Sequence, residues 1–311
     1  MSRVLIRNVS RSLSLSLFVG MVLHAQVAPT TYTPPPMPRI LSQYRSVTAD
    51  ALKNPPANDW LMIRRTYDGW GYSPLEQITT ANAKNLKPVW VFATGEPRVH
   101  EAPPIVNNGV MFVTTPNNQV IAIDAKSGTL LWRYRRVRPT GSRVPHDTNR
   151  GVALFGDKVY YAAGEAVLVA LNAKTGEEAW TTQVADNASG YYISLAPLVV
   201  DGKVLVGCSG GEYGVRGFVA AYDLETGKEV WRTYTIPAPG EPGSETWPKG
   251  GDQWKTGGGS IWVTGNYDAA TNLSYWGTGN GGPWMGDQRP GDNLYATSTI
   301  AIDVATGKIK G

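Results

Sequence analysis

The sequence predicts an all-β protein, a β-propeller built from four-stranded antiparallel blades. Three observations lead to this class. One short motif recurs along the chain, apolar runs alternate with turn residues between its copies, and a tryptophan closes most copies at the same position. The composition agrees, because 35 glycines and 22 prolines in 311 residues are too many turn formers for a charge-rich helical bundle. Hydrophobic residues make up 42% of the chain, enough for a substantial core.

Residues 1–25 have the layout of a secretory signal peptide. Three arginines and no acidic residue lie before or within an apolar N-terminal stretch that ends near Leu23, and cleavage is expected after Ala25. The apolar stretch is shorter than the roughly 20 residues that a membrane span needs, and no later segment qualifies. We therefore expect a periplasmic protein without a transmembrane helix after signal removal; an uncleaved anchor is the alternative.

Residues 26–58 are predicted to form a proline-rich linker and an N-terminal arm, followed by a partial propeller over residues 59–311. The linker prediction depends on residues 29–38, whose prolines favour an extended, solvated chain. The formal net charge of +4 gives no basic footprint for nucleic acid. The single cysteine, Cys208, excludes an intramolecular disulfide and a thiolate metal cluster, and we expect it to be buried.

The recurring motif sets the strand pattern. Its four copies read AIDAKSGTLLW, ALNAKTGEEAW, AYDLETGKEVW and AIDVATGKIKG, and they begin at Ala122, Ala170, Ala221 and Ala301. Between copies, runs such as PLVVDGKVLVGC alternate β-favouring residues with Asn-Gly or Asp-Gly hairpin turns, which predicts about four short strands in each unit. Three tryptophans share one register and are expected to dock against the neighbouring sheet: Trp132, Trp180 and Trp231.

The interval between the third and fourth copies is longer than the earlier ones. It marks either one unit with a long insertion or two units, one of which has lost its motif. The insertion is favoured because residues 240–259 are rich in proline, glycine and polar side chains, with strands expected at 260–263 and 273–277. The last copy stops at Gly311, before its tryptophan. Because a propeller closes on itself, we expect the chain to be the N-terminal part of a longer protein.

Several familiar motifs fail their context tests. GTGNGG, at residues 277–282, fits the dinucleotide pattern, but PWMGDQRPGDN follows where a helix is required. The chain has no phosphate-binding loop and no nucleophile elbow, and three histidines argue against a histidine-based zinc site. Glu212 and Asn280 remain, each in a glycine-rich strand end. Their oxygens suit a hard cation such as calcium. Each residue alone is more often a turn residue, and the similar setting of the two is what suggests a cation site.

Several long strings resemble the periplasmic quinoprotein alcohol dehydrogenases. They are DWLMIRRTYDGWGYSPLEQIT, HEAPPIV, GCSGGEYGVRGFVAAYD, TGGGSIW and YWGTGNGGPW, and the similarity runs from about Asp59 to Gly311. Members of this family are eight-bladed propellers that use pyrroloquinoline quinone (PQQ) and calcium, so the propeller here would be incomplete. The resemblance implies oxidation of a small alcohol by hydride transfer to calcium-bound PQQ, with a lanthanide as the alternative cation. A periplasmic cytochrome or a membrane quinone would accept the electrons.

The resemblance also implies roles for individual residues. Glu212 and Asn280 would ligate the metal, and Trp262 would form the floor on which the quinone stacks. The remaining matched positions contact the cofactor in the family, and here they are Glu101, Arg150, Ser194, Ser209, Gly210, Gly211 and Ser260. Without the motif, Trp262 is equally compatible with a core position, Arg150 with a surface charge and Ser194 with an ordinary strand residue.

The sequence departs from the family in two ways. The adjacent Cys-Cys pair of many members is replaced by VPHDTNRG, at residues 144–151. The family's catalytic aspartate is expected beyond Gly311, so the chain alone is expected to be inactive, and Asp147 is expected to be a loop residue rather than a substitute. The alternative function is a non-catalytic propeller scaffold of the cell envelope, which would have no reason to keep the metal-ligand candidates. A sugar-oxidising quinoprotein fits these strings less well.

Overall fold

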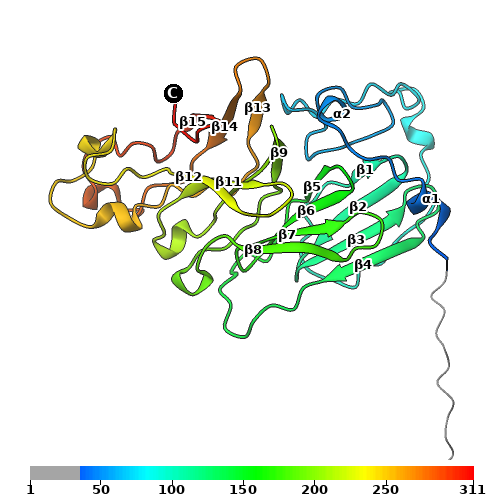
Figure 1. The fold of residues 1–311 in the computed structure, drawn as a ribbon, viewed down its shortest axis with the longest axis horizontal. Helices are drawn as coiled ribbons and strands as arrows, with labels where there is room; N and C mark the ends of the chain where they lie inside the picture. Colours follow the sequence, from blue (N-terminus) through cyan, green and yellow to red (C-terminus); the bar gives the residue numbers. More distant parts are fainter. Residues whose placement is uncertain (1–35) are drawn as a thin grey trace, which may run out of the picture. The chain divides into compact units, whose positions relative to one another are not determined.

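A computed structural model describes residues 36–311, so the expected signal peptide and nearly all of the proline-rich linker lie outside the described residues. Residues 37–311 form one compact unit. Its strands build four separate antiparallel sheets that follow one another in chain order (Figure 1). The predicted all-β class is confirmed, and the four-stranded blade is confirmed in three of the four sheets. No helix in the described part of the chain is long and apolar enough to cross a membrane.

In each sheet the strands pair with their neighbours in sequence. The first sheet contains β1 (Ile105–Asn107), β2 (Val110–Thr115), β3 (Gln119–Asp124) and β4 (Leu130–Arg135). The second contains β5 (Val152–Phe155), β6 (Lys158–Ala163), β7 (Val167–Asn172) and β8 (Glu178–Gln183). The third contains β9 (Leu198–Val200), β10 (Lys203–Gly207), β11 (Phe218–Asp223) and β12 (Glu229–Tyr234). The first strands of the second and third sheets meet, since β5 contacts β9, and β2 of the first sheet also contacts β5.

The fourth sheet has three strands, namely β13 (Asn266–Asp268), β14 (Leu273–Gly277) and β15 (Thr299–Asp303). Ile309 then forms an isolated antiparallel bridge to Ile302. The long interval is therefore one sheet with inserted residues, as favoured from the sequence. The extra residues lie in two places, in the loop before β13 and in the loop between β14 and β15.

The strand predicted at residues 260–263 is wrong, because this segment forms a loop. Its backbone groups bond singly to different neighbours instead of forming a ladder. Ile261 N donates to Cys208 O at 2.7 Å, and Ser260 O accepts from Gly279 N at 2.7 Å. The segment thus ties two other loops together. The remaining short helices are α1 (Arg39–Ser42), α2 (Ala49–Lys53), η1 (Ala83–Asn85), η2 (Asn187–Ser189), η3 (Gly211–Tyr213), η4 (Ser244–Thr246), η5 (Gln253–Thr256) and η6 (Gly286–Gln288).

The recurring motif forms the same turn four times. An aspartate or asparagine accepts hydrogen bonds from backbone N–H groups two or three residues later; Asp124 Oδ1, for example, accepts from Lys126 N at 2.8 Å and from Ser127 N at 3.0 Å. A glycine with positive φ completes each turn. These glycines are Gly128, Gly176, Gly227 and Gly307. A Cβ atom on any of them would lie within 3 Å of a tryptophan ring, so glycine is required on steric as well as conformational grounds.

The tryptophan at each turn belongs to the preceding unit. Trp132 donates its indole N–H to Ala173 O at 2.9 Å, and Trp180 and Trp231 bond Leu224 O and Val304 O at 3.1 and 3.0 Å. The docking predicted for these tryptophans is confirmed. Trp90 makes the same bond to Ala125 O at 3.1 Å, an interaction that the motif did not predict. We call these four turns with their docked indoles the outer rim.

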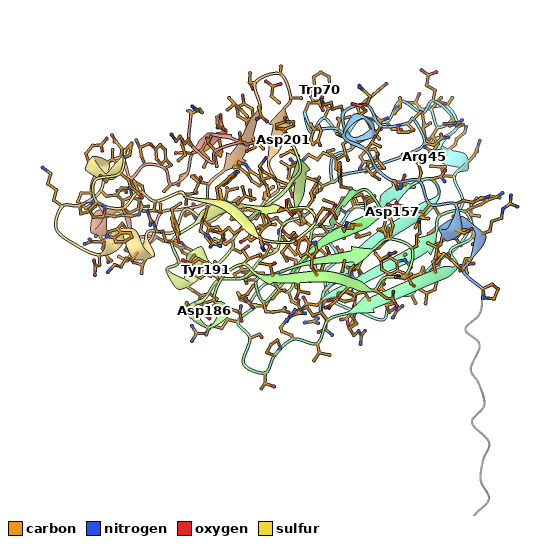
Figure 2. The ribbon with its side chains drawn as sticks, in the orientation of Figure 1. Arg45, Trp70, Asp157, Asp186, Tyr191 and Asp201 are labelled. Carbon is orange, nitrogen blue, oxygen red and sulfur yellow. The ribbon has the colours of Figure 1, made fainter. Side chains whose placement is uncertain are left out.

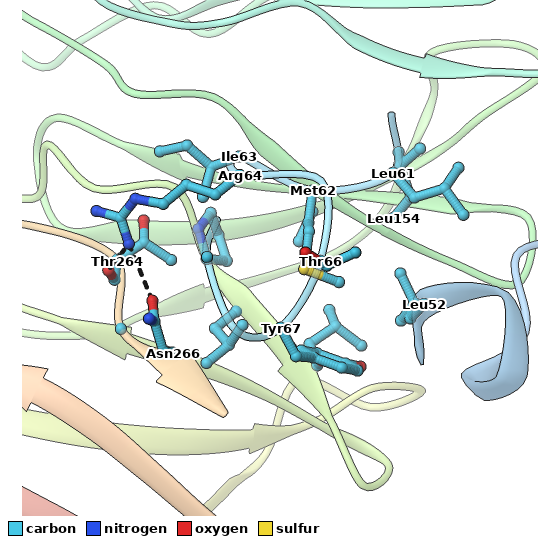
Figure 3. A pocket seen from close by; sticks show the side chains of 16 residues that line it. Leu52, Leu61, Met62, Ile63, Arg64, Thr66, Tyr67, Leu154, Thr264 and Asn266 are labelled. Carbon is cyan, nitrogen blue, oxygen red and sulfur yellow. Dashed lines mark hydrogen bonds between the residues drawn. The ribbon is translucent and has the colours of Figure 1, made fainter. Parts of the chain in front are cut away.

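The described part of the N-terminal arm, together with residues 59–64, closes over the first, second and fourth sheets. Val47 exchanges backbone hydrogen bonds with Gly156, and Trp60 does so with Val106. Arg64 Nη1 reaches Asn266 Oδ1 at 3.0 Å beside a small cavity of about 10 Å³ (Figure 3). Its lining is mainly apolar and its volume suits at most about one water molecule. We therefore regard this cavity as part of the packing between the arm and the sheets.

The segment that follows the arm is far less buried. Trp70 is 82% exposed (Figure 2), and Val89 and Val91 on either side of the docked Trp90 are each 88% exposed. No strand is formed between residues 65 and 104. This segment therefore contacts the sheets through isolated anchors such as Trp90.

Candidate functional site

One open cavity of about 370 Å³ gathers loops from all four sheets. Two kinds of loop line it. Connecting loops lead into the first strand of a sheet and supply residues such as Arg150, two positions before β5. Hairpin loops join the second and third strands of a sheet, and those of the third and fourth sheets supply Glu212 and Asn280. We call this set of loops the loop face.

All ten site residues expected from the sequence line this cavity: Glu101, Arg150, Ser194, Ser209, Gly210, Gly211, Glu212, Ser260, Trp262 and Asn280. Four further residues complete the lining, namely His146, Thr148, Tyr192 and Trp284. The volume lies within the usual range for small-molecule sites. Segments up to about 180 residues apart in the sequence thus converge on one space.

Arg150 organises one side of the cavity. Its Nη2 atom forms an ion pair with Glu101 Oε2 at 2.6 Å, and its Nη1 atom donates to Ser194 Oγ at 2.8 Å. Ser194 Oγ also lies 3.0 Å from Ser209 Oγ. Both serines are buried, at 3% and 2% exposure, so the guanidinium is held by a preformed polar network. This side of the cavity offers a fixed cation and hydroxyl groups to a ligand.

Trp262 gives the cavity an aromatic surface. Its side chain is 46% exposed, whereas the adjacent Ile261 is completely buried. The Arg150 guanidinium carbon lies 5.2 Å from the centre of the Trp262 ring, within the range of a cation–π contact. A second indole, that of Trp284, is 64% exposed at the same cavity. Exposed aromatic rings beside a cation suit a flat, anionic ligand.

Glu212 carries the free carboxylate of the site. Its Oε1 atom accepts a hydrogen bond of 2.6 Å from the Tyr192 hydroxyl, and His146 Nε2 lies 3.7 Å from the same oxygen. No lysine or arginine pairs with this carboxylate among the residues that the structure describes. Asn280 is exposed and lines the same cavity. A carboxylate and a carboxamide without a basic partner can serve as oxygen ligands for a hard cation.

The hairpin loop that carries Glu212 depends on a glycine. Gly210 has φ +115°, and a Cβ atom there would lie 2.3 Å from Gly190 O. The preceding residue is fixed by a hydrogen bond of 2.7 Å from Ser209 N to Tyr192 O. Close backbone contact between the two loops therefore brings Tyr192 and Glu212 together.

The donor set fits the pair of groups that the sequence resemblance implies. An exposed indole face, a fixed guanidinium and three serine hydroxyls suit a planar quinone with carboxylate groups, such as PQQ. Glu212 and Asn280 suit calcium or another hard cation. The residues suited to the quinone and the residues suited to the cation therefore border the same cavity.

Three of the four lining residues that sequence reasoning missed follow a simple spacing. His146, Thr148 and Arg150 alternate along one connecting loop, and Tyr192 alternates with Ser194 along the next. Tyr192 forms an isolated antiparallel bridge with Ser209, and in such extended backbone alternate side chains point to the same side. The backbone at residues 146–148 turns instead, since Thr148 N donates to His146 O at 2.7 Å. Counting back by two from Arg150 and from Ser194 would have found three of the four. Trp284 lies within a long hairpin loop, where no such period applies.

Two other residues discussed from the sequence lie outside the cavity lining. Asp147 pairs with Arg98 and Arg138, each at 2.6 Å. Burial would raise the pKa of Asp147, but the Arg138 hydrogen bond and further contacts outweigh it and lower that pKa below its usual value. Cys208 is completely buried, as expected, and burial raises the pKa of its thiol to about 12.

Comparison with known proteins agrees with this architecture. The family described as "PQQ: Glucose/ethanol/alcohol dehydrogenase, beta-propeller domain" matches residues 60–310. The quinoprotein alcohol dehydrogenase PedH of Pseudomonas putida is 42% identical over 262 residues, which cover 78% of this chain and 44% of PedH.

Two solved structures are similar in both fold and sequence. The quinohemoprotein alcohol dehydrogenase ADHIIG of Pseudomonas putida HK5 aligns with a TM-score of 0.80 and 38% identity over 86% of this chain and 42% of that one. A europium-containing methanol dehydrogenase aligns with a TM-score of 0.78 and 37% identity over 84% of this chain and 50% of that one. The chain spans about half the length, or less, of these relatives.

Proposed function

The chain belongs to the family of PQQ-dependent glucose, ethanol and alcohol dehydrogenase propellers, and from this membership we propose that it forms the cofactor-holding part of a quinoprotein alcohol dehydrogenase. The observation that carries the proposal is the single cavity bordered by Arg150, Trp262, Glu212 and Asn280. When bound, PQQ would supply the oxidant that accepts a hydride from the alcohol, with its carbonyl polarised by a cation.

The residues of this chain would bind and orient these groups. Trp262 provides the surface on which a planar ring system stacks, and Arg150, restrained by Glu101 and Ser194, directs its N–H groups to carboxylate or carbonyl oxygens. Glu212 and Asn280 supply cation ligands. Ser209 and Ser260, which are 2% and 7% exposed, add hydroxyl groups held in fixed positions.

We further propose that the protein acts in the periplasm on a small alcohol and passes electrons to a cytochrome or a membrane quinone. The N-terminal signal pattern and the alcohol dehydrogenase relatives support this setting. Calcium is the proposed cation, and the similarity to a europium-containing enzyme supports a lanthanide as the alternative.

The test is binding of PQQ and calcium to the full-length protein, measured by calorimetry. We expect Glu212→Ala to abolish calcium binding, because it removes the carboxylate from the ligand pair formed by Glu212 and Asn280. The matched control is Glu177→Ala, which removes an exposed carboxylate from an outer-rim turn and should leave the affinity unchanged.

Circular dichroism establishes that Glu212→Ala is folded before its binding is interpreted. Calcium and PQQ affinities equal to those of the unchanged protein would contradict the site assignment. A protein that binds neither group at millimolar calcium would instead be the non-catalytic scaffold.

A further inference from the structure

The Glu212 carboxylate is engaged on one oxygen only. Tyr192 donates to Oε1 at 2.6 Å, and His146 approaches that same atom at 3.7 Å. Within residues 36–311 no hydrogen bond reaches Oε2. One carboxylate oxygen is therefore held by a protein donor, and the other has no hydrogen-bond donor among these residues.

The Tyr192 side chain, which donates to Oε1, is more deeply buried than the Glu212 side chain that accepts the bond. The Tyr192 side chain is 4% exposed, and the Tyr192 backbone carbonyl accepts from Ser209 N at 2.7 Å. The Glu212 side chain is 29% exposed and lies in a glycine-rich hairpin loop. Without a partner, its rotatable bonds would leave the carboxylate free to sample several orientations.

His146 cannot take over this role. Its side chain is 72% exposed, and its separation of 3.7 Å from Oε1 exceeds hydrogen-bond length. The Tyr192 hydroxyl, at 2.6 Å, is therefore the side-chain donor that holds this carboxylate.

We propose that Tyr192 is a positioning residue that holds the Glu212 carboxylate through Oε1 and so directs the carboxylate to the cation. This inference rests on the proposed cation site. Partners of metal-ligating carboxylates typically contribute about 10- to 100-fold to metal affinity by orienting the ligand. The role assigned to Tyr192 runs through Glu212, because its hydroxyl donates to Oε1 at 2.6 Å.

The chain offers a matched pair of substitutions for the test. Tyr192→Phe removes the hydroxyl and keeps the buried ring. Tyr191→Phe is the control, because the Tyr191 hydroxyl bonds the Arg216 backbone at 3.2 Å and Tyr191 does not line the cavity (labelled in Figure 2). The probe is terbium(III), titrated into the full-length protein and followed by its luminescence.

We expect Tyr192→Phe to raise the terbium dissociation constant about 10- to 100-fold, with binding still saturable. Tyr191→Phe should leave that constant unchanged, although its melting temperature falls. The luminescence decay in H₂O and D₂O reports how many waters remain on the ion. A loosened carboxylate should admit additional water in Tyr192→Phe, an effect that lost stability alone does not produce.

A second variant, Glu212→Asp, tests the same contact from the other side in case Tyr192→Phe does not fold. Glu212→Asp shortens the side chain and withdraws the carboxylate from the hydroxyl, so it should weaken terbium binding in the same direction. Adding Tyr192→Phe to Glu212→Asp should then have little further effect, because the two changes break one contact.

The possible failures are distinguishable. An unchanged terbium constant in folded Tyr192→Phe, together with loss of binding in Glu212→Ala, overturns the role of Tyr192 and leaves the cation site intact. Retained binding in Glu212→Ala overturns the proposed cation site itself.

Discussion

The outer rim and the loop face are built in opposite ways. At the outer rim, four turns repeat one arrangement, in which an indole N–H bonds a backbone carbonyl of the next unit at 2.9 to 3.1 Å. On the loop face, no two loops are alike, and each contributes different side chains to the cavity. Repetition therefore holds the sheets together, whereas the departures from repetition create the site.

Two hairpin loops, one outside the cavity lining and one within it, show a related contrast. Glu165, in the second sheet, is 3% exposed and bonds Arg136 Nε at 2.7 Å and Asn118 Nδ2 at 2.5 Å. Glu212, at the equivalent place in the third sheet, has a neutral hydroxyl as its donor. A carboxylate saturated by its own chain has a structural role, and a carboxylate left without a cation can bind one.

The largest effect is expected at the outer rim. Trp132→Ala should lower the free energy of unfolding by about 3–5 kcal/mol, because Trp132 is 8% exposed and fills the space above Gly176. Chemical denaturation measures the loss. Calcium affinity should stay within about twofold of its original value, and a parallel fall in affinity would break the separation between rim and loop face.

An intermediate effect is expected at Glu165, in the hairpin loop of the second sheet. Glu165→Gln should cost about 2 kcal/mol, because the Arg136 guanidinium loses its charged acceptor. Glu177→Gln, on an exposed turn, is the control and should cost much less. If Glu165→Gln lowered calcium affinity as Glu212→Ala does, the two carboxylates would not have distinct roles.

The smallest effect is expected at Asp147. Its pKa is lower in the folded protein than in the unfolded chain, so its charge stabilises the fold above the unfolded pKa of about 4. That contribution disappears as the pH falls through the folded pKa. Asp147→Asn should cost about 1 kcal/mol at pH 7, and this difference should shrink below about pH 4.

Denaturation curves of both proteins from pH 3 to 7 measure the pH dependence of Asp147→Asn. A difference that does not change with pH would mean that the ion pairs with Arg98 and Arg138 contribute nothing to stability.

The repeats made most of the fold predictable. An Asp-x-x-Thr-Gly turn followed by Trp has a local cause, since side-chain acceptors and a positive φ lie within a few residues. Trp90 was missed because no such turn precedes it, although its indole bond is the same. The strand expected at 260–263 failed because Ile261 bonds to a loop some fifty residues away. Single long-range backbone bonds leave no periodic signal in a sequence.

The residues that line the site were predictable where they fall in sequence strings that resemble a known family. Contacts that depend only on how two loops meet in space were not predictable. The ten expected residues do line one cavity. The hydrogen bond between Tyr192 and Glu212 depends on the approach of two loops around Gly190 and Gly210. That approach depends on tertiary geometry, and neither the residue types nor their spacing predicts it.

The docked indoles give the molecule a direction of assembly. Each tryptophan precedes the carbonyl that it bonds, by 35 residues for Trp90, 41 for Trp132, 44 for Trp180 and 73 for Trp231. A chain leaving the ribosome therefore exposes each indole before its receiving turn has been synthesised. Each sheet, once its turn has formed, can dock against an indole of the preceding unit, so folding can proceed from the N-terminus one sheet at a time.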